Sequence, residues 1–134
     1  MPTDLEVSLS ARPGTLAAAS GALGRAGVNI EGQCAYVGDG RGVYHLLVAN
    51  AEVARRALID SGFVILAERR VVVHAIEDRP GAASAVLTRV AEQGVSIDLV
   101  YLSARGELVL GGDDPAAIAR ALETAAPVAT ASLG

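Results

Sequence analysis

The chain has few of the residues that build disulfides, metal clusters or nucleic-acid surfaces. Its 134 residues include one cysteine, no tryptophan, three tyrosines and one phenylalanine. A single cysteine, Cys34, excludes an intrachain disulfide and a multi-cysteine metal site, and it suits a reducing compartment. With 11 basic against 15 acidic residues the net charge is −4, so nothing attracts a phosphate backbone. Nucleic acid is therefore excluded as a partner, and no cofactor is expected.

Long apolar runs are also missing. The stretch over residues 63–67 is among the longest, and it is far too short to cross a bilayer. The N-terminus has no basic segment followed by an apolar one, so we expect no secretory signal. Hydrophobic residues still make up 51 % of the chain, which is enough for a core. The sequence therefore predicts a cytoplasmic protein that does not contact a membrane.

The sequence repeats itself. Arg12-Pro13-Gly14 recurs as Arg79-Pro80-Gly81, and Gly27-Val28-Asn29-Ile30 recurs as Gly94-Val95-Ser96-Ile97, each 67 residues later. Residues 54–58 are echoed by residues 118–122 at an offset of 64, and we attribute the drop of three to a shorter hairpin in the second half. So many matches in one order predict two copies of one unit, residues 1–69 and residues 70–134.

The first unit has a clear pattern of strands and helices. Leu5, Val7 and Leu9 alternate with polar residues, as in a half-buried strand, and residues 13–26 carry apolar side chains at helical spacing. Pro13 is expected in the first turn of this helix and Gly27 at its C-terminal cap. A strand over 28–37, a turn, a strand over 43–48, a helix that Asn50 caps and a strand over 63–66 complete the unit.

The second unit repeats this order. Strands are expected over 71–76, 95–103 and 108–110, with helices that end near residues 93 and 125; a fourth strand is only weakly marked, at best Val128 to Thr130. The order βαββαβ, found twice, predicts an α+β fold of two ferredoxin-like units, each with helices on one face of an antiparallel sheet. Because almost no linker separates the units, we expect them to pack together as an intrachain pseudo-dimer.

A strand that ends in Arg-Pro-Gly, followed by a helix that ends in Gly-Val-Asn-Ile, resembles the ACT domain family, and its duplication resembles stand-alone tandem ACT proteins. The resemblance implies a regulatory protein without catalysis that binds a free amino acid between two ACT units. It also implies a homodimer, or a regulated enzyme as partner. The contacts that it implies lie at the corner before the first helix and at the start of the second strand: Ala11, Arg12, Gly14, Asn29 and Ile30 in the first unit, and Asp78, Arg79, Gly81, Ser96 and Ile97 in the second.

These residues suit a zwitterion. Backbone N–H groups at Gly14 and Gly81 stand at helix starts, where unpaired donors and the helix dipole favour an anion. Asp78 can accept from an ammonium group, and Asn29 of the other unit can orient a carboxylate. We expect one dominant site built from Asp78 and Asn29 across the pseudo-dyad. Two plainer interpretations stay open, in which Asp78 caps the following helix and Asn29 bonds its own loop.

Several other residues have structural interpretations. Cys34 is interpreted as a core thiol on the side that faces the helices, and His74 as a core histidine. His45 has no acidic partner at ligand spacing in the sequence, so no metal site is expected. Three apolar side chains are expected on the sheet face away from the helices, where they would serve dimerisation: Tyr44, Val100 and Leu102.

Two other functions fit the same fold. An acylphosphatase-like hydrolase would hold a phosphate with Arg12 or Arg79 and place a water with Asn29, although the proline and glycine after each arginine do not resemble that family's phosphate loop. A protein–protein interaction module would transmit regulation without any ligand. An RNA-binding sheet, by contrast, would need aromatic residues on its central strands and a basic face, which this chain lacks.

Overall fold

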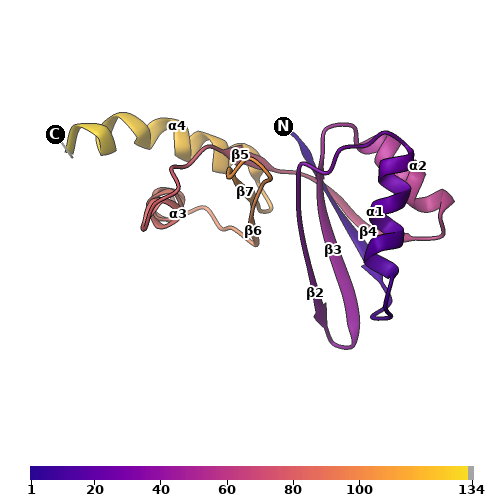
Figure 1. The fold of residues 1–134 in the computed structure, drawn as a ribbon. Helices are drawn as coiled ribbons and strands as arrows, with labels where there is room; N and C mark the ends of the chain where they lie inside the picture. The colour runs from indigo at the N-terminus through magenta and orange to yellow at the C-terminus, as the bar shows by residue number, and fades with distance from the viewer. Residues whose placement is uncertain (133–134) are drawn as a thin grey trace.

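The described residues form two sheets and four helices (Figure 1). The structure is a computed structural model that describes the backbone of residues 1–132 and the side chains of residues 1–123. The first unit consists of β1 (Thr3–Leu9), α1 (Thr15–Arg25), β2 (Gly32–Gly38), β3 (Arg41–Val48), α2 (Ala51–Asp60) and β4 (Val64–Arg70). The second unit consists of β5 (Val72–His74), α3 (Ala82–Glu92), β6 (Leu99–Leu102), β7 (Leu108–Gly111) and α4 (Pro115–Ser132).

Both sheets are antiparallel, with strand orders β2-β3-β1-β4 and β5-β7-β6. In the first unit the inward side chains of β1 and β3 form one buried cluster with α1 and α2, centred on Leu5, Leu23, Leu46 and Leu58. The second unit has a separate cluster that includes Val90 and Ile118. The expected α+β fold of two ferredoxin-like units, each with helices on one face of its sheet, is confirmed.

The element bounds show the duplication directly. Helices α1 and α3, strands β2 and β6, and strands β3 and β7 each begin 67 residues apart, whereas α2 and α4 begin at 51 and 115, which is 64 apart. The shortening therefore falls after the start of β7 and not in the hairpin, which corrects the expectation from the sequence. Strand β7 has four residues where β3 has eight.

The second unit lacks the fourth strand expected at Val128 to Thr130. These residues belong to α4, which runs from Pro115 to Ser132. Its start is capped by Asp114, whose carboxylate accepts from the Ala117 N–H at 3.0 Å. Strand β5 consequently has no neighbour on its outer side among the described residues.

The strands that follow α1 and α3 begin later than expected. Residues 28–31 and 95–98 form loops, and their alternating apolar residues Val28, Ile30, Val95 and Ile97 pack against the two cores without strand pairing. The period of two arises because an extended loop under a helix also turns every second side chain inward.

The Arg-Pro-Gly corners differ slightly from the sequence expectation. Pro13 precedes the helix, since α1 begins at Thr15 and Gly14 is its N-cap with φ 92°. Gly81 repeats this conformation before α3 with φ 84°. A side chain would be strained at such angles, which explains glycine at both places. Gly27 also has positive φ after α1, and Asn50 caps α2, as expected.

The second unit lies on part of the outer face of the first sheet, opposite α1 and α2. Three rows of side chains cross this face, as the strand registers define. The row that contains Leu47 and Asp4 is covered by the second unit, and both residues are almost fully buried. The row that contains Tyr36 and Val64 stays open, with 53 % and 60 % of these residues exposed.

No helix among the described residues is long and apolar enough to cross a membrane.

Candidate functional site

The first corner leaves the start of α1 without a capping side chain. Thr15 turns its hydroxyl backward, donating to the Ser10 carbonyl at 2.8 Å, and the Arg12 Nε donates to the Ser10 Oγ at 3.2 Å. The first turn of α1 contains no acidic residue and receives no side-chain cap. The Thr15 N–H donates to the Arg12 carbonyl at 3.5 Å. The Leu16 and Ala17 N–H groups, by contrast, have no partner among the described residues and can bind an anion beside the exposed Arg12 guanidinium.

Two hollows flank this corner, and both are lined by residues of the first unit. One, which we call the corner hollow, has a volume of about 250 Å³. Its walls are mostly apolar, and Arg12 is the charged residue among them; they are formed by Leu9, Ser10, Ala11, Arg12, Thr15, Leu16, Ala35, Tyr36, Val37, Gly42 and Val43. The other has about 510 Å³ and is more polar, since Ser8, Ser10 and Ser61 line it together with Gly14. The corner hollow thus combines one cation with an apolar wall.

The second corner repeats the backbone of the first and carries more charge. Arg79 donates from Nε to the Glu77 carboxylate at 3.1 Å, and both side chains are exposed. Asp78 is exposed and makes no hydrogen bond or ion pair with the residues that the structure describes. Helix α3 has Gly81 as its N-cap and no side-chain cap, so the interpretation of Asp78 as a helix cap is wrong.

The four residues expected at strand starts lie in the loops before β2 and β6. Asn29 is exposed and borders a hollow of about 370 Å³ together with Asn50, near the end of α1. Ser96 is also exposed, whereas Ile30 and Ile97 pack against the two cores. Ile30 and Ile97 can therefore contribute only backbone contacts to a site, whereas the side chains of Asn29 and Ser96 are accessible.

The structure does not bring the two corners of one chain together. Figure 1 shows the loop between β1 and α1 at the lower right and the loop between β5 and α3 at the left. Within the first unit, Arg12 and Asn29 stand at opposite ends of the 11-residue helix α1, about 16 Å long. Arg12 and Asn29 are therefore too far apart to bind one phosphate together, and this pair of the acylphosphatase interpretation is not assembled.

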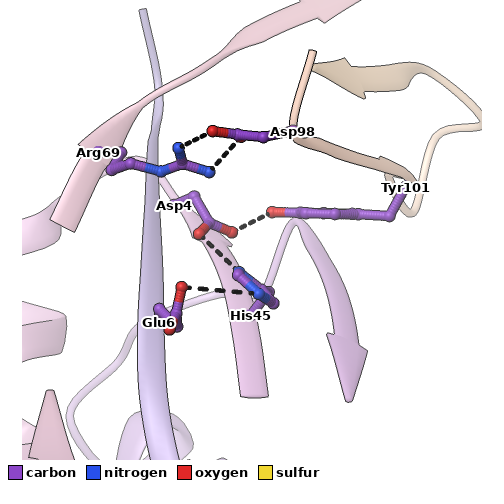
Figure 2. A network of polar contacts seen from close by, with 6 residues as sticks. All are labelled: Asp4, Glu6, His45, Arg69, Asp98 and Tyr101. Atoms are coloured by element: carbon purple, nitrogen blue, oxygen red, sulfur yellow. Dashed lines mark hydrogen bonds and ion pairs between the residues drawn. The ribbon is translucent and has the colours of Figure 1, made fainter. Parts of the chain in front are cut away.

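A buried polar network joins the two units instead (Figure 2). Asp4 on β1 is completely buried, and its Oδ1 accepts from the Tyr101 hydroxyl of β6 at 2.7 Å. Its Oδ2 lies 2.9 Å from His45 Nδ1 of β3, which donates in the tautomer that carries the proton there. The other ring nitrogen of His45 lies 3.9 Å from Glu6. Each oxygen of the buried carboxylate therefore has a partner, as burial requires.

An ion pair between Arg69 on β4 and Asp98, just before β6, lies at the edge of the network. Arg69 donates two hydrogen bonds to Asp98, both at 3.0 Å. The hydrogen bond from Arg69 lowers the pKa of Asp98, and the same bond raises the pKa of Arg69. In the contact between the two units, which we call the junction, burial and the bond to Asp4 raise the pKa of Tyr101, so this hydroxyl stays protonated.

This ion pair predicts a small dependence of stability on pH. Because the pKa of Asp98 is lowered on folding, its contribution is present above the unfolded value near 4 and is lost as pH falls through the folded value. Both groups are partly exposed, so Asp98→Asn should lower the free energy of unfolding by less than about 1 kcal/mol at pH 7. Urea unfolding should show this difference shrinking toward pH 3. A difference that grows with acidity would contradict the assignment. Glu77→Gln is the control, because the partner of Glu77, Arg79, lies only two residues away in the sequence.

The network was not predicted from the sequence, and three expectations at this face were wrong. Cys34 and His45 are cross-strand neighbours on the outer face of the sheet, not on the helix side. His45 does have acidic partners, which come from a different strand. Tyr44 points toward α1, where its hydroxyl lies 3.1 Å from the Ser20 Oγ and bonds to Gln33. The alternation of Asp4 and His45 with apolar residues was the available signal, but it marked them as solvent-facing.

The face expected for Val100 and Leu102 was also wrong, whereas the expectation for His74 was partly right. Val100 and Leu102 are exposed, but they pair with Leu110 and Leu108 of the second core and so lie on its helix side. His74 is partly buried, and burial lowers its pKa, with a smaller effect from Arg89.

Proteins of known structure share this architecture. The protein BT0572 from Bacteroides thetaiotaomicron has a TM-score of 0.80 at 22 % identity, covering 91 % of this chain and 86 % of that one. The regulatory subunit of aspartate kinase from Thermus thermophilus has a TM-score of 0.68 at 18 % identity, over 92 % of this chain and 91 % of its own. That from Thermus flavus has 0.61 at 17 % identity, over 92 % of both. No protein-family model and no curated protein sequence matches the chain. These likenesses show the fold, which is an α+β architecture of ferredoxin-like units.

Proposed function

We propose that the protein is a regulatory, non-catalytic protein that binds a free amino acid, with the first corner as the principal contact. The observation that carries this proposal is the uncapped start of α1 beside Arg12 and the corner hollow. The free N–H groups and the guanidinium bind the ligand carboxylate, and the apolar walls receive its side chain. A hollow of about 250 Å³ is large enough for a small amino acid.

A second copy of the chain completes the site in this proposal. Arg12 is the charged residue in the wall of the corner hollow, so a carboxylate for the ligand ammonium has to come from elsewhere. Asp78 is an exposed carboxylate without a partner among the described residues, and Asn29 and Ser96 are exposed polar groups of the other half-sites. Because the two corners of one chain lie apart, a homodimer is the simplest arrangement that brings them together.

The fold supports regulation of a partner enzyme, since regulatory subunits of aspartate kinase share it. An interaction module without a ligand remains the second candidate. The open row of the outer face favours it, because Tyr36 and Val64 expose apolar surface there.

A thermal-shift screen of the twenty amino acids tests the proposal. At one hundred times Kd a ligand should stabilise the protein by about 2.7 kcal/mol, which is several degrees in Tm for a chain of this size. Arg12→Gln should remove the response, and so should the double variant Asp78→Ala/Asn29→Ala. Arg25→Gln is the matched control, because it removes a positive charge from the other end of the same helix. If no amino acid changes Tm, the proposal fails and the interaction module takes its place.

A further inference from the structure

We propose that strand β2 and the Asp4 network couple the corner hollow to the seating of the second unit on the first, so that this junction is where the proposed ligand exerts its regulatory effect. The inference relies on the proposed function for the ligand itself. The coupling between the hollow and the junction is a property of the protein alone and can be measured without ligand.

Strand β2 contributes residues both to the corner hollow and to the junction between the two units. At one end Ala35, Tyr36 and Val37 line the corner hollow. At the other end Gly32 lies against the second unit, where a Cβ atom would come within 3.2 Å of Ser103 Cα and of the Tyr101 ring. The Ala104 N–H of the second unit donates to the Glu31 carbonyl, just before β2, at 2.8 Å. A displacement of β2 at the hollow therefore reaches the junction within four residues, about 13 Å along the strand.

Side chains make a second connection between the same two places. The rings of Tyr36 and His45 are stacked, with centroids 6.3 Å apart and an interplanar angle of 22°. His45 is bonded to Asp4, and Asp4 accepts from Tyr101 of the second unit (Figure 2). Tyr36 thus stands at the hollow end of an unbroken chain of contacts that finishes in the second unit. Such continuity is necessary for coupling, and a measured interaction between the two ends is its proof.

Besides the Asp4 network, the junction between the two units has a small apolar cluster and one ion pair. The apolar part has four buried residues, Leu47, Val71, Tyr101 and Val109. The Arg69–Asp98 pair is partly exposed and contributes little. The bonds of Asp4 are fully buried, so breaking one leaves a buried polar group unpaired. The second unit is therefore either seated with these bonds made or displaced with them broken and hydrated.

Amide hydrogen exchange of Ala104 tests the coupling, because this N–H bonds across the junction. Tyr36→Ala removes the ring that lines the hollow and stacks on His45. It should accelerate Ala104 exchange about three- to tenfold, as expected for the loss of an aromatic stack. Tyr101→Phe removes one hydroxyl and should accelerate exchange by about tenfold or more. The double variant should exchange like Tyr101→Phe alone, because the path is already cut.

Arg55→Gln is the control, since it removes the Arg55–Glu68 pair between α2 and β4, which involves neither β2 nor the Asp4 network. It should leave the ratio of Ala104 exchange to that of core amides in the first unit unchanged. An unchanged Ala104 rate in Tyr36→Ala, or additive effects in the double variant, would overturn the coupling.

The same exchange measurement with an amino acid present distinguishes this inference from the proposed function. The amino acid with the largest thermal shift should slow Ala104 exchange in the wild type and not in Tyr101→Phe. If no amino acid binds, the proposed function fails while the variant rates still decide the coupling. If an amino acid binds and leaves Ala104 unchanged in the wild type, the coupling is wrong and the binding proposal stands.

Discussion

Replacing Asp4 by alanine should lower the free energy of unfolding by about 3–5 kcal/mol, as for other buried pairs that lose one partner. The carboxylate is completely buried and serves two partners, Tyr101 at 2.7 Å and His45 at 2.9 Å. Without it, a hydroxyl and a ring N–H are left unpaired in a buried junction, and each unpaired group carries a desolvation penalty. Urea unfolding at constant pH measures the loss.

Two variants show whether the loss belongs to the network. Asp4→Asn keeps an oxygen for Tyr101 and should be less destabilising than the alanine variant. Glu6→Ala removes the next acid on the same face of β1, which is 31 % exposed and 3.9 Å from His45, and it should cost less than about 1 kcal/mol. An Asp4→Ala variant as stable as Glu6→Ala would show that the network does not hold the two units.

Gly112→Ala should destabilise the protein by about 1–3 kcal/mol, the usual range for overpacking. Gly112 connects β7 to α4, in the part of the chain where the second unit is three residues shorter than the first. A Cβ atom there would lie 2.6 Å from the Ser96 carbonyl oxygen and 3.2 Å from Ile118 Cδ1. The backbone of the loop before β6 would have to move, because a carbonyl oxygen cannot rotate away as a flexible side chain can.

Gly24→Ala is the opposite case and serves as the control. Gly24 lies inside α1, and a Cβ atom there meets nothing within 4 Å. Alanine should therefore stabilise the helix by about 0.5–1 kcal/mol. Tm measurements on the two variants should move in opposite directions. Equal effects would contradict the close approach of Gly112 to Ser96.

The duplication made most of the fold predictable. Two copies of Arg-Pro-Gly at one spacing located both helix starts to within two residues, and the Gly27 and Gly94 positions located their ends. The turn after residue 37 located β3, and the period of two found β1, because one face of this strand lies against a core. The same pattern overextended β2 and β6, since it cannot distinguish a paired strand from an extended loop that packs under a helix.

Long-range contacts explain what the sequence did not predict. Asp4, His45 and Tyr101 come from three different strands, 41 and 97 residues apart in the two pairs that meet. Nothing in their local sequence distinguishes them from solvent-facing residues, and only the docking of the second unit buries them. Likewise, the corners could be identified from local motifs, but their relative placement depends on how one unit sits on the other.

The central claim, that a free amino acid binds at the first corner, is tested most directly by nuclear magnetic resonance. The measurement is a titration of ¹⁵N-labelled protein with the amino acid that gives the largest thermal shift. The account predicts saturable changes in the amide signals of Arg12, Gly14 and Thr15 and of the β2 residues Ala35 to Val37, which line the corner hollow or its edge. Signals at the corner that do not move at a saturating concentration, while others elsewhere do, would contradict it.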